Sequence, residues 1–219
     1  MKLQIPLLFL FSMLLLSCDP EVKENERSLV KGTVLDFEGN PIAIVPVTTT
    51  TGKLLLGEDF TDRNGNFEFT SLEPKSGDLI IDVNAEDDNS PFGTYSIIYS
   101  QKPLQQNYNL SNITLRKKAI LVFDIKKTST ENSTLDWSLE YTEPFCEVYD
   151  DEETNQSIGR CYENTSFSEI LDAANPDFES EFASVQNTTA QFTYQINKEA
   201  PQTISIELTE ATNFYEFEY

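Results

Sequence analysis

Alternation of apolar and polar residues with a period of two is the feature that most constrains the fold of this chain. Between Leu135 and Tyr141, every second residue is apolar and the residues between them are polar. The same pattern recurs over residues 191–196, 204–208 and 215–219. This period is typical of β-strands that bury one face against a core and expose the other to water. The chain is therefore predicted to be an all-β protein.

Further apolar runs extend this prediction over the rest of the chain. Turn-forming residues separate many of these runs, at Glu38–Pro41, Arg63–Asn66 and Lys75–Asp78. Only Ser166–Ala174 has a pattern that fits a short helix. Many short strands with so little helix predict antiparallel β-sandwiches. The runs fall at residues 29–35, 67–69, 79–83, 113–115 and 120–125, and the last of these is apolar enough for a central strand.

The length and the charge distribution predict two domains. A chain of 219 residues suits two small domains better than one. Most of the acidic excess lies after Lys117, so the boundary is placed at Lys117–Lys118. We predict one β-sandwich over residues 29–117 and a second, of unknown family, over residues 118–219.

The first of these halves resembles the carboxypeptidase regulatory-like domain. The residues that carry the resemblance are Val30–Ile42, Val45–Val47, Thr61–Phe69 and Leu72, and it covers residues 29–85 well. The resemblance implies a transthyretin-like sandwich of about seven strands. Gly39 and Gly65 stand where hairpin turns need a positive φ angle. Pro46 departs from the pattern, because it lacks an amide donor and predicts a strand that is at an edge or bulged.

The amino-terminal residues predict export and lipidation. Lys2 precedes the apolar stretch Leu3–Leu16, which is shorter than the ~20 residues that a membrane-spanning helix needs. Leu15–Cys18 resembles the bacterial lipobox, which implies cleavage of a signal peptide over residues 1–17 and acylation of Cys18. Several acyl chains on one residue give stable anchoring. We expect a membrane partner through this lipid anchor.

An acidic tether is predicted to follow the lipidated cysteine. Residues 18–28 contain four acids, two bases and hardly any apolar surface, so they are expected to lack order. Asp19 after the cysteine resembles an inner-membrane retention signal of one bacterial lineage, whereas the acidic stretch resembles an outer-membrane export signal of others. We expect an envelope location, at the outer rather than the inner membrane.

The two remaining cysteines, Cys146 and Cys161, predict a disulfide. An exported chain meets an oxidising compartment, where an even pair of cysteines forms a bridge. A zinc site is the alternative, but two thiols in a chain without histidine make a poor ligand set.

Charge and composition exclude several classes of function. The net charge is −22, which repels phosphate backbones, so no nucleic-acid partner is expected. The absence of histidine removes Ser-His-Asp and Cys-His nucleophile systems. Paired carboxylates remain, but among 37 acids the nearness of two is no evidence. We predict no enzyme, no catalytic residue and no cofactor.

Two acidic segments have features of calcium sites. Asp62, Asn64 and Asn66 are spaced like the start of an EF-hand loop, with Glu73 at the twelfth position, but Phe67 stands where that loop needs glycine. A turn in which Asp62 bonds its own backbone explains the same residues. Glu86–Asn89 is a similarly weak candidate, and Asp150–Glu153 is interpreted as a solvated loop. No metal is predicted.

Aromatic residues supply the remaining functional hypothesis. Tyr95, Tyr99 and Trp137 are candidate ligand contacts, although Trp137 shares its face with apolar neighbours and is expected in the core. The predicted function is a non-catalytic, membrane-anchored scaffold or recognition module at the cell envelope. The alternatives are a glycan-binding surface lipoprotein and an accessory subunit of an outer-membrane assembly, for which Tyr215–Tyr219 is a candidate donor strand.

Overall fold

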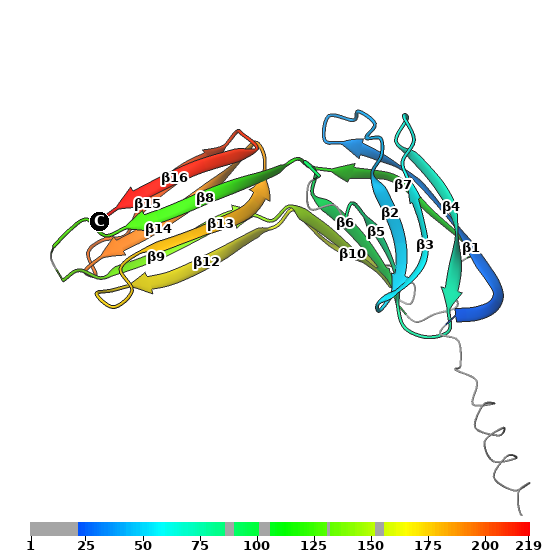
Figure 1. Ribbon diagram of the computed structural model, residues 1–219, viewed down its shortest axis with the longest axis horizontal. Helices are drawn as coiled ribbons and strands as arrows, with labels where there is room; N and C mark the ends of the chain where they lie inside the picture. Colours follow the sequence, from blue (N-terminus) through cyan, green and yellow to red (C-terminus); the bar gives the residue numbers. More distant parts are fainter. Residues whose placement is uncertain (1–21, 86–89, 101–105, 131, 152–155) are drawn as a thin grey trace, which may run out of the picture.

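The computed structural model describes residues 22–85, 90–100, 106–130, 132–151 and 156–219. Within these residues every regular element is a β-strand, and the strands form two lobes, each built of two sheets (Figure 1). The predicted all-β fold with two β-sandwiches is therefore confirmed. Strand boundaries follow the alternation seen in the sequence, because each strand presents one row of apolar side chains to a core.

The first sandwich packs a three-stranded sheet, ordered β4-β1-β7, against a larger sheet. Val34, Phe67, Ile81 and Ile113 are among the residues that fill the core between them. Gly39 and Gly65 have φ angles of 87° and 75°, so the positive φ angles predicted at these positions are confirmed. The prediction of hairpins is corrected, because the strands on either side of each turn belong to different sheets. Seven strands from the first half build this lobe: β1 (Val22–Asp36), β2 (Pro46–Thr51), β3 (Leu54–Phe60), β4 (Asn66–Pro74), β5 (Leu79–Val83), β6 (Thr94–Tyr99) and β7 (Asn107–Leu115).

A hairpin from the second half of the sequence completes the larger sheet of the first sandwich. Strand β10 (Phe145–Asp151) pairs in parallel with β6, and β11 (Gln156–Cys161) pairs with β10, which gives the order β11-β10-β6-β5-β2-β3. Val148 of this hairpin packs against the first core. The expectation that residues 118–219 form the second sandwich alone is therefore corrected for the hairpin, because backbone pairing with β6 draws it into the first sandwich.

The second sandwich packs sheet β12-β9-β14-β15 against sheet β13-β8-β16. Its core is rich in aromatic rings, and Phe123 of the central strand β8 lies 5.4 Å from Trp137 and 5.1 Å from Phe192, measured between ring centroids. The strands are β8 (Lys118–Lys126), β9 (Leu135–Thr142), β12 (Asn164–Leu171), β13 (Phe178–Val185), β14 (Thr188–Ile196), β15 (Gln202–Leu208) and β16 (Thr212–Glu218).

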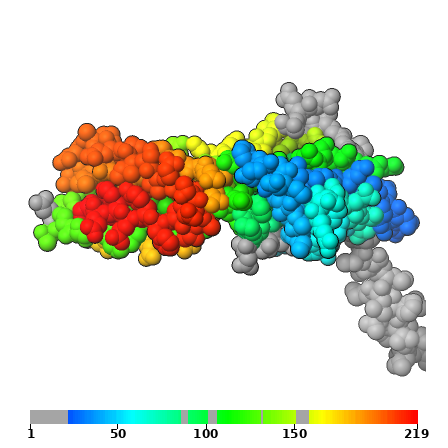
Figure 2. All heavy atoms as spheres, turned by 90° about the horizontal axis from the view of Figure 1, so that it is seen from above, coloured from blue at the N-terminus to red at the C-terminus, as the bar shows by residue number. Residues whose placement is uncertain are grey.

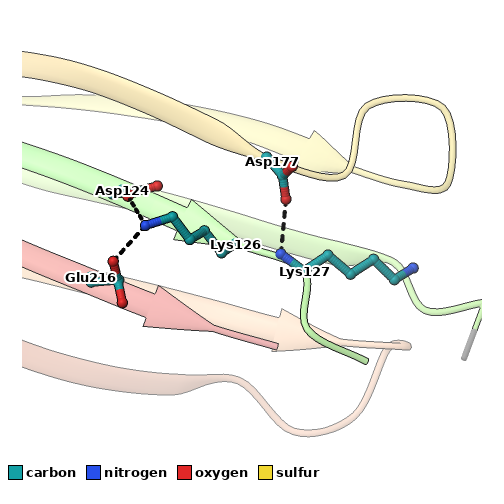
Figure 3. A network of polar contacts seen from close by, with 5 residues as sticks. All are labelled: Asp124, Lys126, Lys127, Asp177 and Glu216. Carbon is teal, nitrogen blue, oxygen red and sulfur yellow. Dashed lines mark hydrogen bonds and ion pairs between the residues drawn. The ribbon is translucent and has the colours of Figure 1, made fainter. Parts of the chain in front are cut away.

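The carboxyl-terminal strand is held within this sandwich. Strand β16 runs parallel to β8, and Lys126 of β8 bridges the two strands by an ion pair of 2.6 Å to Glu216 (Figure 3). Lys126 also forms an ion pair of 2.5 Å to Asp124 within β8. Next to it, the backbone amide of Lys127 donates a 2.9 Å hydrogen bond to the Asp177 carboxylate. The segment considered as a donor strand, Tyr215–Tyr219, therefore contributes to its own sheet.

Three local predictions are corrected. The tether expected over residues 18–28 is ordered from Val22, because β1 begins there and its Arg27 and Ser28 pair with β4. The short helix expected at Ser166–Ala174 is largely strand β12, since pairing with β9 supplies its backbone hydrogen bonds. Of the two alternatives predicted from Pro46, the edge position is corrected, because β2 is internal and Pro46 is its first residue, where no ladder donor is lost. The other alternative is supported, since the register of β2 shifts at Thr49/Thr50.

A continuous ribbon joins the two sandwiches. Strands β9 and β12 pair with each other in the second sandwich. Strand β9 continues beyond Thr142 into β10, and β11 leads into β12 at Asn164. Strands β10 and β11 pair with each other in the first sandwich. The backbone bond from the Glu143 amide to the Glu163 carbonyl, 2.9 Å, continues the pairing across the gap. With the β7–β8 connection, three chain segments cross between the lobes. The lobes lie end to end (Figures 1 and 2).

Polar contacts close the joint between the lobes. The Tyr162 hydroxyl donates a 3.0 Å hydrogen bond to the Thr114 carbonyl and accepts one of 3.1 Å from the Arg116 amide. The Arg116 guanidinium also lies 5.7 Å from the Tyr162 ring centroid, within the range of a cation–π contact. Burial of the Tyr162 side chain raises the pKa of its phenol, so this hydroxyl stays protonated and keeps donating. The two sandwiches are therefore joined by more than a single linker.

Candidate interaction surfaces

The two carboxyl-proximal cysteines form the predicted disulfide. Cys146 on β10 and Cys161 on β11 are direct cross-strand partners, their Cα atoms are 3.8 Å apart, and the structure links their sulfurs. The bridge closes the base of the hairpin that the second half of the sequence adds to the first sandwich. Cys18, the predicted lipidation site, lies outside the described residues.

The three aromatic residues considered as ligand contacts do not share a surface. Trp137 is 1% exposed in the core of the second sandwich, whereas Tyr99 is 9% exposed in the core of the first. Tyr95 is half-buried against that first core, and burial raises the pKa of its phenol. All three have packing roles, so they are not retained as ligand contacts.

The calcium-like spacing at Asp62 is a turn. One carboxylate oxygen of Asp62 accepts 2.8 Å hydrogen bonds from the backbone amides of Asn64 and Asn66, and these bonds lower the pKa of Asp62. Glu73 is buried at the far end of β4. In the described part of the chain, no group of three or more His, Cys, Asp or Glu side chains is arranged to hold a metal ion. Of the other acidic segments, residues 86–89 and residues 152–153 lie outside the described part of the chain.

An apolar row crosses the solvent face of the six-stranded sheet. Cross-strand partners have side chains on the same face, so the pairing register traces the row from strand to strand. The outer members are well exposed, at 46% for Leu55, 43% for Tyr149 and 64% for Ile158. The neighbours Ile81 and Ile97 point into the core. From β3 to β11 this apolar row consists of Leu55, Ile80, Ile98, Tyr149 and Ile158, with the threonine Thr50 between Leu55 and Ile80. Thr50, Ile80 and Ile98 are half-buried.

Acidic side chains flank the apolar row. The next outward-facing row of cross-strand partners contains Glu58, Asp82 and Glu147, with Arg160 at its end. Desolvation raises the pKa of Asp82, and the negative charge of Glu147 raises it further. A hydrogen bond from the Ser96 hydroxyl lowers the pKa of Asp82 and opposes these two effects. A hydrogen bond to Glu147 raises the pKa of the Tyr149 phenol. The face thus pairs an apolar stripe with negative charge.

Sequence reasoning did not find this surface, because its members come from distant segments. Leu55 and Ile158 are brought to the same row only by five successive strand pairings, including the parallel one between β6 and β10. The sequence contains one weak signal of this surface. Ile80 is adjacent to the core residue Ile81, and Ile98 is adjacent to the core residue Ile97. Because successive side chains of a strand point to opposite faces, Ile80 and Ile98 must lie on the outer face.

Comparison with known proteins identifies no relative of this chain. No family model and no curated protein matches the sequence, so the resemblance to the carboxypeptidase regulatory-like domain is not confirmed. Among the described residues, no helix has the length and apolar character needed to cross a membrane.

Solved structures with similar arrangements include pilin and fimbrial proteins of bacteria. The Streptococcal ancillary pilin is 11% identical, with 90% of this chain and 63% of that one covered at a TM-score of 0.31. The tip fimbrial protein Mfa3 from Porphyromonas gingivalis is 11% identical, with coverage of 83% and 81% and a TM-score of 0.31. Shaft pilin SpaA from Lactobacillus rhamnosus GG is 10% identical, with coverage of 88% and 97% and a TM-score of 0.31.

Other solved structures are matched over only part of their length. The chain spans 20% of a 9R-lipoxygenase from Cyanothece, at 21% identity and a TM-score of 0.30, and 34% of the Bacillus anthracis TIE protein, at 11% identity and a TM-score of 0.34. Scores this low carry no functional argument. The function is therefore argued from the surfaces of this chain.

Proposed function

We propose that this chain is a non-catalytic recognition module of the bacterial cell envelope, which is lipid-anchored at Cys18 and holds a protein partner against the apolar row. The observation that carries the proposal is the row itself. Solvent faces of antiparallel sheets normally carry polar side chains, and a contiguous exposed apolar patch marks a site of interaction. The resemblance of the acidic stretch after Cys18 to an export signal supports the outer membrane as the proposed location.

The partner is expected to have an apolar ridge with basic residues beside it. Glu58, Asp82 and Glu147 flank the row, and complementary charge favours productive encounters and opposes acidic competitors. The ribbon joins this face to a second sandwich, which suits a scaffold. The proposal corresponds most closely to the accessory subunit of a larger envelope assembly.

Site-directed photocrosslinking in cells tests the partner. A benzophenone side chain at position 158 should capture one envelope protein reproducibly. The same group at Ile170 is a matched control, since Ile170 is also 64% exposed but lies outside the row. Leu55→Glu, at the opposite end of the row, should weaken capture from position 158. Equal capture of the protein from positions 158 and 170 would contradict the proposal, as would unchanged capture from position 158 in the Leu55→Glu variant.

The anchor is tested separately. Cys18→Ala should move the protein from the membrane fraction to the soluble fraction, because the acylated residue is lost. Continued partition of the variant with membranes would show that anchoring does not depend on Cys18, while leaving the crosslinking result to decide the role of the apolar row.

A further inference from the structure

A polar groove lies on the opposite side of the first sandwich, over sheet β4-β1-β7. It has a volume of about 660 Å³, within the range of small-molecule sites. Two rows of cross-strand partners run over its floor and point to solvent. These rows are Asn109, Lys31 and Glu68, and Asn112, Thr33 and Asn66.

A β-bulge hollows this face. Lys31 pairs with Asn109 and Thr33 pairs with Asn112, so β7 has one residue more than β1 between the two pairs. Ser111 has a φ angle of 51°, which is uncommon for a residue other than glycine. As a result, Ser111 and Asn112 are both exposed and both line the groove, where a regular strand would turn one of them inward. Bulges re-aim side chains in this way and are enriched beside functional sites.

An aromatic ring stands among the lining residues. Phe60, at the end of β3, is 56% exposed, and Asp59 and Asp62 on either side of it also line the groove. The backbone amide of Glu68 donates a 3.2 Å hydrogen bond to Asp59, which ties β4 to β3 at this end. The lining therefore combines one apolar wall with carboxylates, amides and hydroxyls.

We propose that this groove binds an uncharged oligosaccharide. Sugar hydroxyls both donate and accept hydrogen bonds, and the lining supplies acceptors from Asp59 and Glu68 together with two-way partners from Asn109 and Asn112. The C–H face of a pyranose ring fits the exposed ring of Phe60. The three carboxylates outnumber Lys31, which disfavours phosphates and acidic sugars.

A metal ion does not account for the same residues. Asp62 already uses one carboxylate oxygen for the amides of Asn64 and Asn66, and Asp59 accepts from the Glu68 amide. The Asn66 side-chain oxygen accepts a 2.9 Å hydrogen bond from the Thr33 hydroxyl. The acceptors are thus spread along the groove at separate points, an arrangement that suits an extended ligand.

The test uses the full chain, purified in a zwitterionic detergent because glucoside detergents would compete. The probes are a glycan array of neutral oligosaccharides, including gluco-, xylo-, manno- and N-acetylglucosamine hexamers, followed by titration calorimetry on each hit. Phe60→Ala should weaken binding about tenfold, the loss expected for one aromatic contact. Phe214→Ala is the matched control, since Phe214 is 78% exposed on the second sandwich.

The outcomes separate cleanly. Binding that falls with Phe60→Ala and with Asn109→Ala, but not with Phe214→Ala, supports the groove. Binding that is equal in Phe60→Ala and wild type, or an array without any hit, overturns it. Far-ultraviolet circular dichroism of each variant confirms that the fold is intact, so a loss of binding cannot come from unfolding.

Discussion

Gly93 lies directly against the carbonyl group of Pro144, so closely that a Cβ atom on Gly93 would be 2.0 Å from the Pro144 oxygen. Gly93 precedes β6 in the first sandwich, and Pro144 lies between β9 and β10 in the ribbon that joins the lobes. The Thr94 amide donates a 3.1 Å hydrogen bond to this same carbonyl. Only a residue without a side chain permits this approach, so glycine at position 93 lets the ribbon lie directly against the start of β6.

Gly93→Ala should destabilise the protein by about 3 kcal/mol, because the added methyl group forces the ribbon away from β6. Urea unfolding at equilibrium measures the change. Gly159→Ala is the control, since the nearest atom to a Cβ there is a Val148 methyl carbon at 3.4 Å, an ordinary contact. Similar midpoints for both variants would show that the joint tolerates a side chain at position 93.

Removal of the Cys146–Cys161 bridge should lower the free energy of unfolding by about 3 kcal/mol, since the bridge spans 15 residues and restricts the unfolded chain. The double serine variant avoids leaving a free thiol. Hydrogen exchange should rise first in β10 and β11, while β14 in the second sandwich keeps its protection. Two titratable thiols in the unreduced wild type, beyond Cys18, would contradict the bridge.

Asp82→Asn should stabilise the protein at neutral pH, because burial raises the pKa of Asp82 and so disfavours its charged form in the folded state. A raised pKa contributes stability below the ordinary value of 3.8 and loses it as the pH rises through the folded pKa. The advantage of asparagine should therefore vanish below pH 3.8, and its amide oxygen still accepts from Ser96. Urea midpoints over this range test the sign; an advantage that is independent of pH would refute it.

Trp137→Ala should cost about 3–5 kcal/mol, because its ring fills the second core between Phe123 and Phe178. Trp137 is the only tryptophan of the chain, so native fluorescence reports on this site alone. We expect blue-shifted emission that resists quenching by acrylamide, whereas efficient quenching of the native protein would mean that the ring is exposed. Trp137→Phe should be the milder variant, since it keeps an apolar ring.

The sequence predicts the strands better than it predicts their partners. The alternation over Leu135–Tyr141 and the glycines of the two turns mark local structure, which depends on residues near in sequence. The hairpin over Phe145–Cys161 shows the limit, because nothing in its composition says which sheet it joins. The ordered start of β1 at Val22 has the same cause, since pairing with β4 gives order to a segment whose side chains bury little.

The surfaces were harder to predict than the fold. The disulfide follows from cysteine count and compartment, and the turn at Asp62 follows from its own sequence. The apolar row and the groove depend on register: a shift of one residue in β10 would turn Tyr149 inward and leave Val148 outside. Such surfaces appear only once the strand order is known.

The central claim is that the ribbon holds the two sandwiches as one body and thereby completes the recognition face. Its most direct test is a distance distribution between spin labels at Lys53→Cys and Glu210→Cys, one exposed site in each sandwich, in a chain with Cys18→Ser and the native disulfide. Double electron–electron resonance should give a single narrow distribution. A broad distribution would contradict the claim, because it would mean that the sandwiches move independently about the joint.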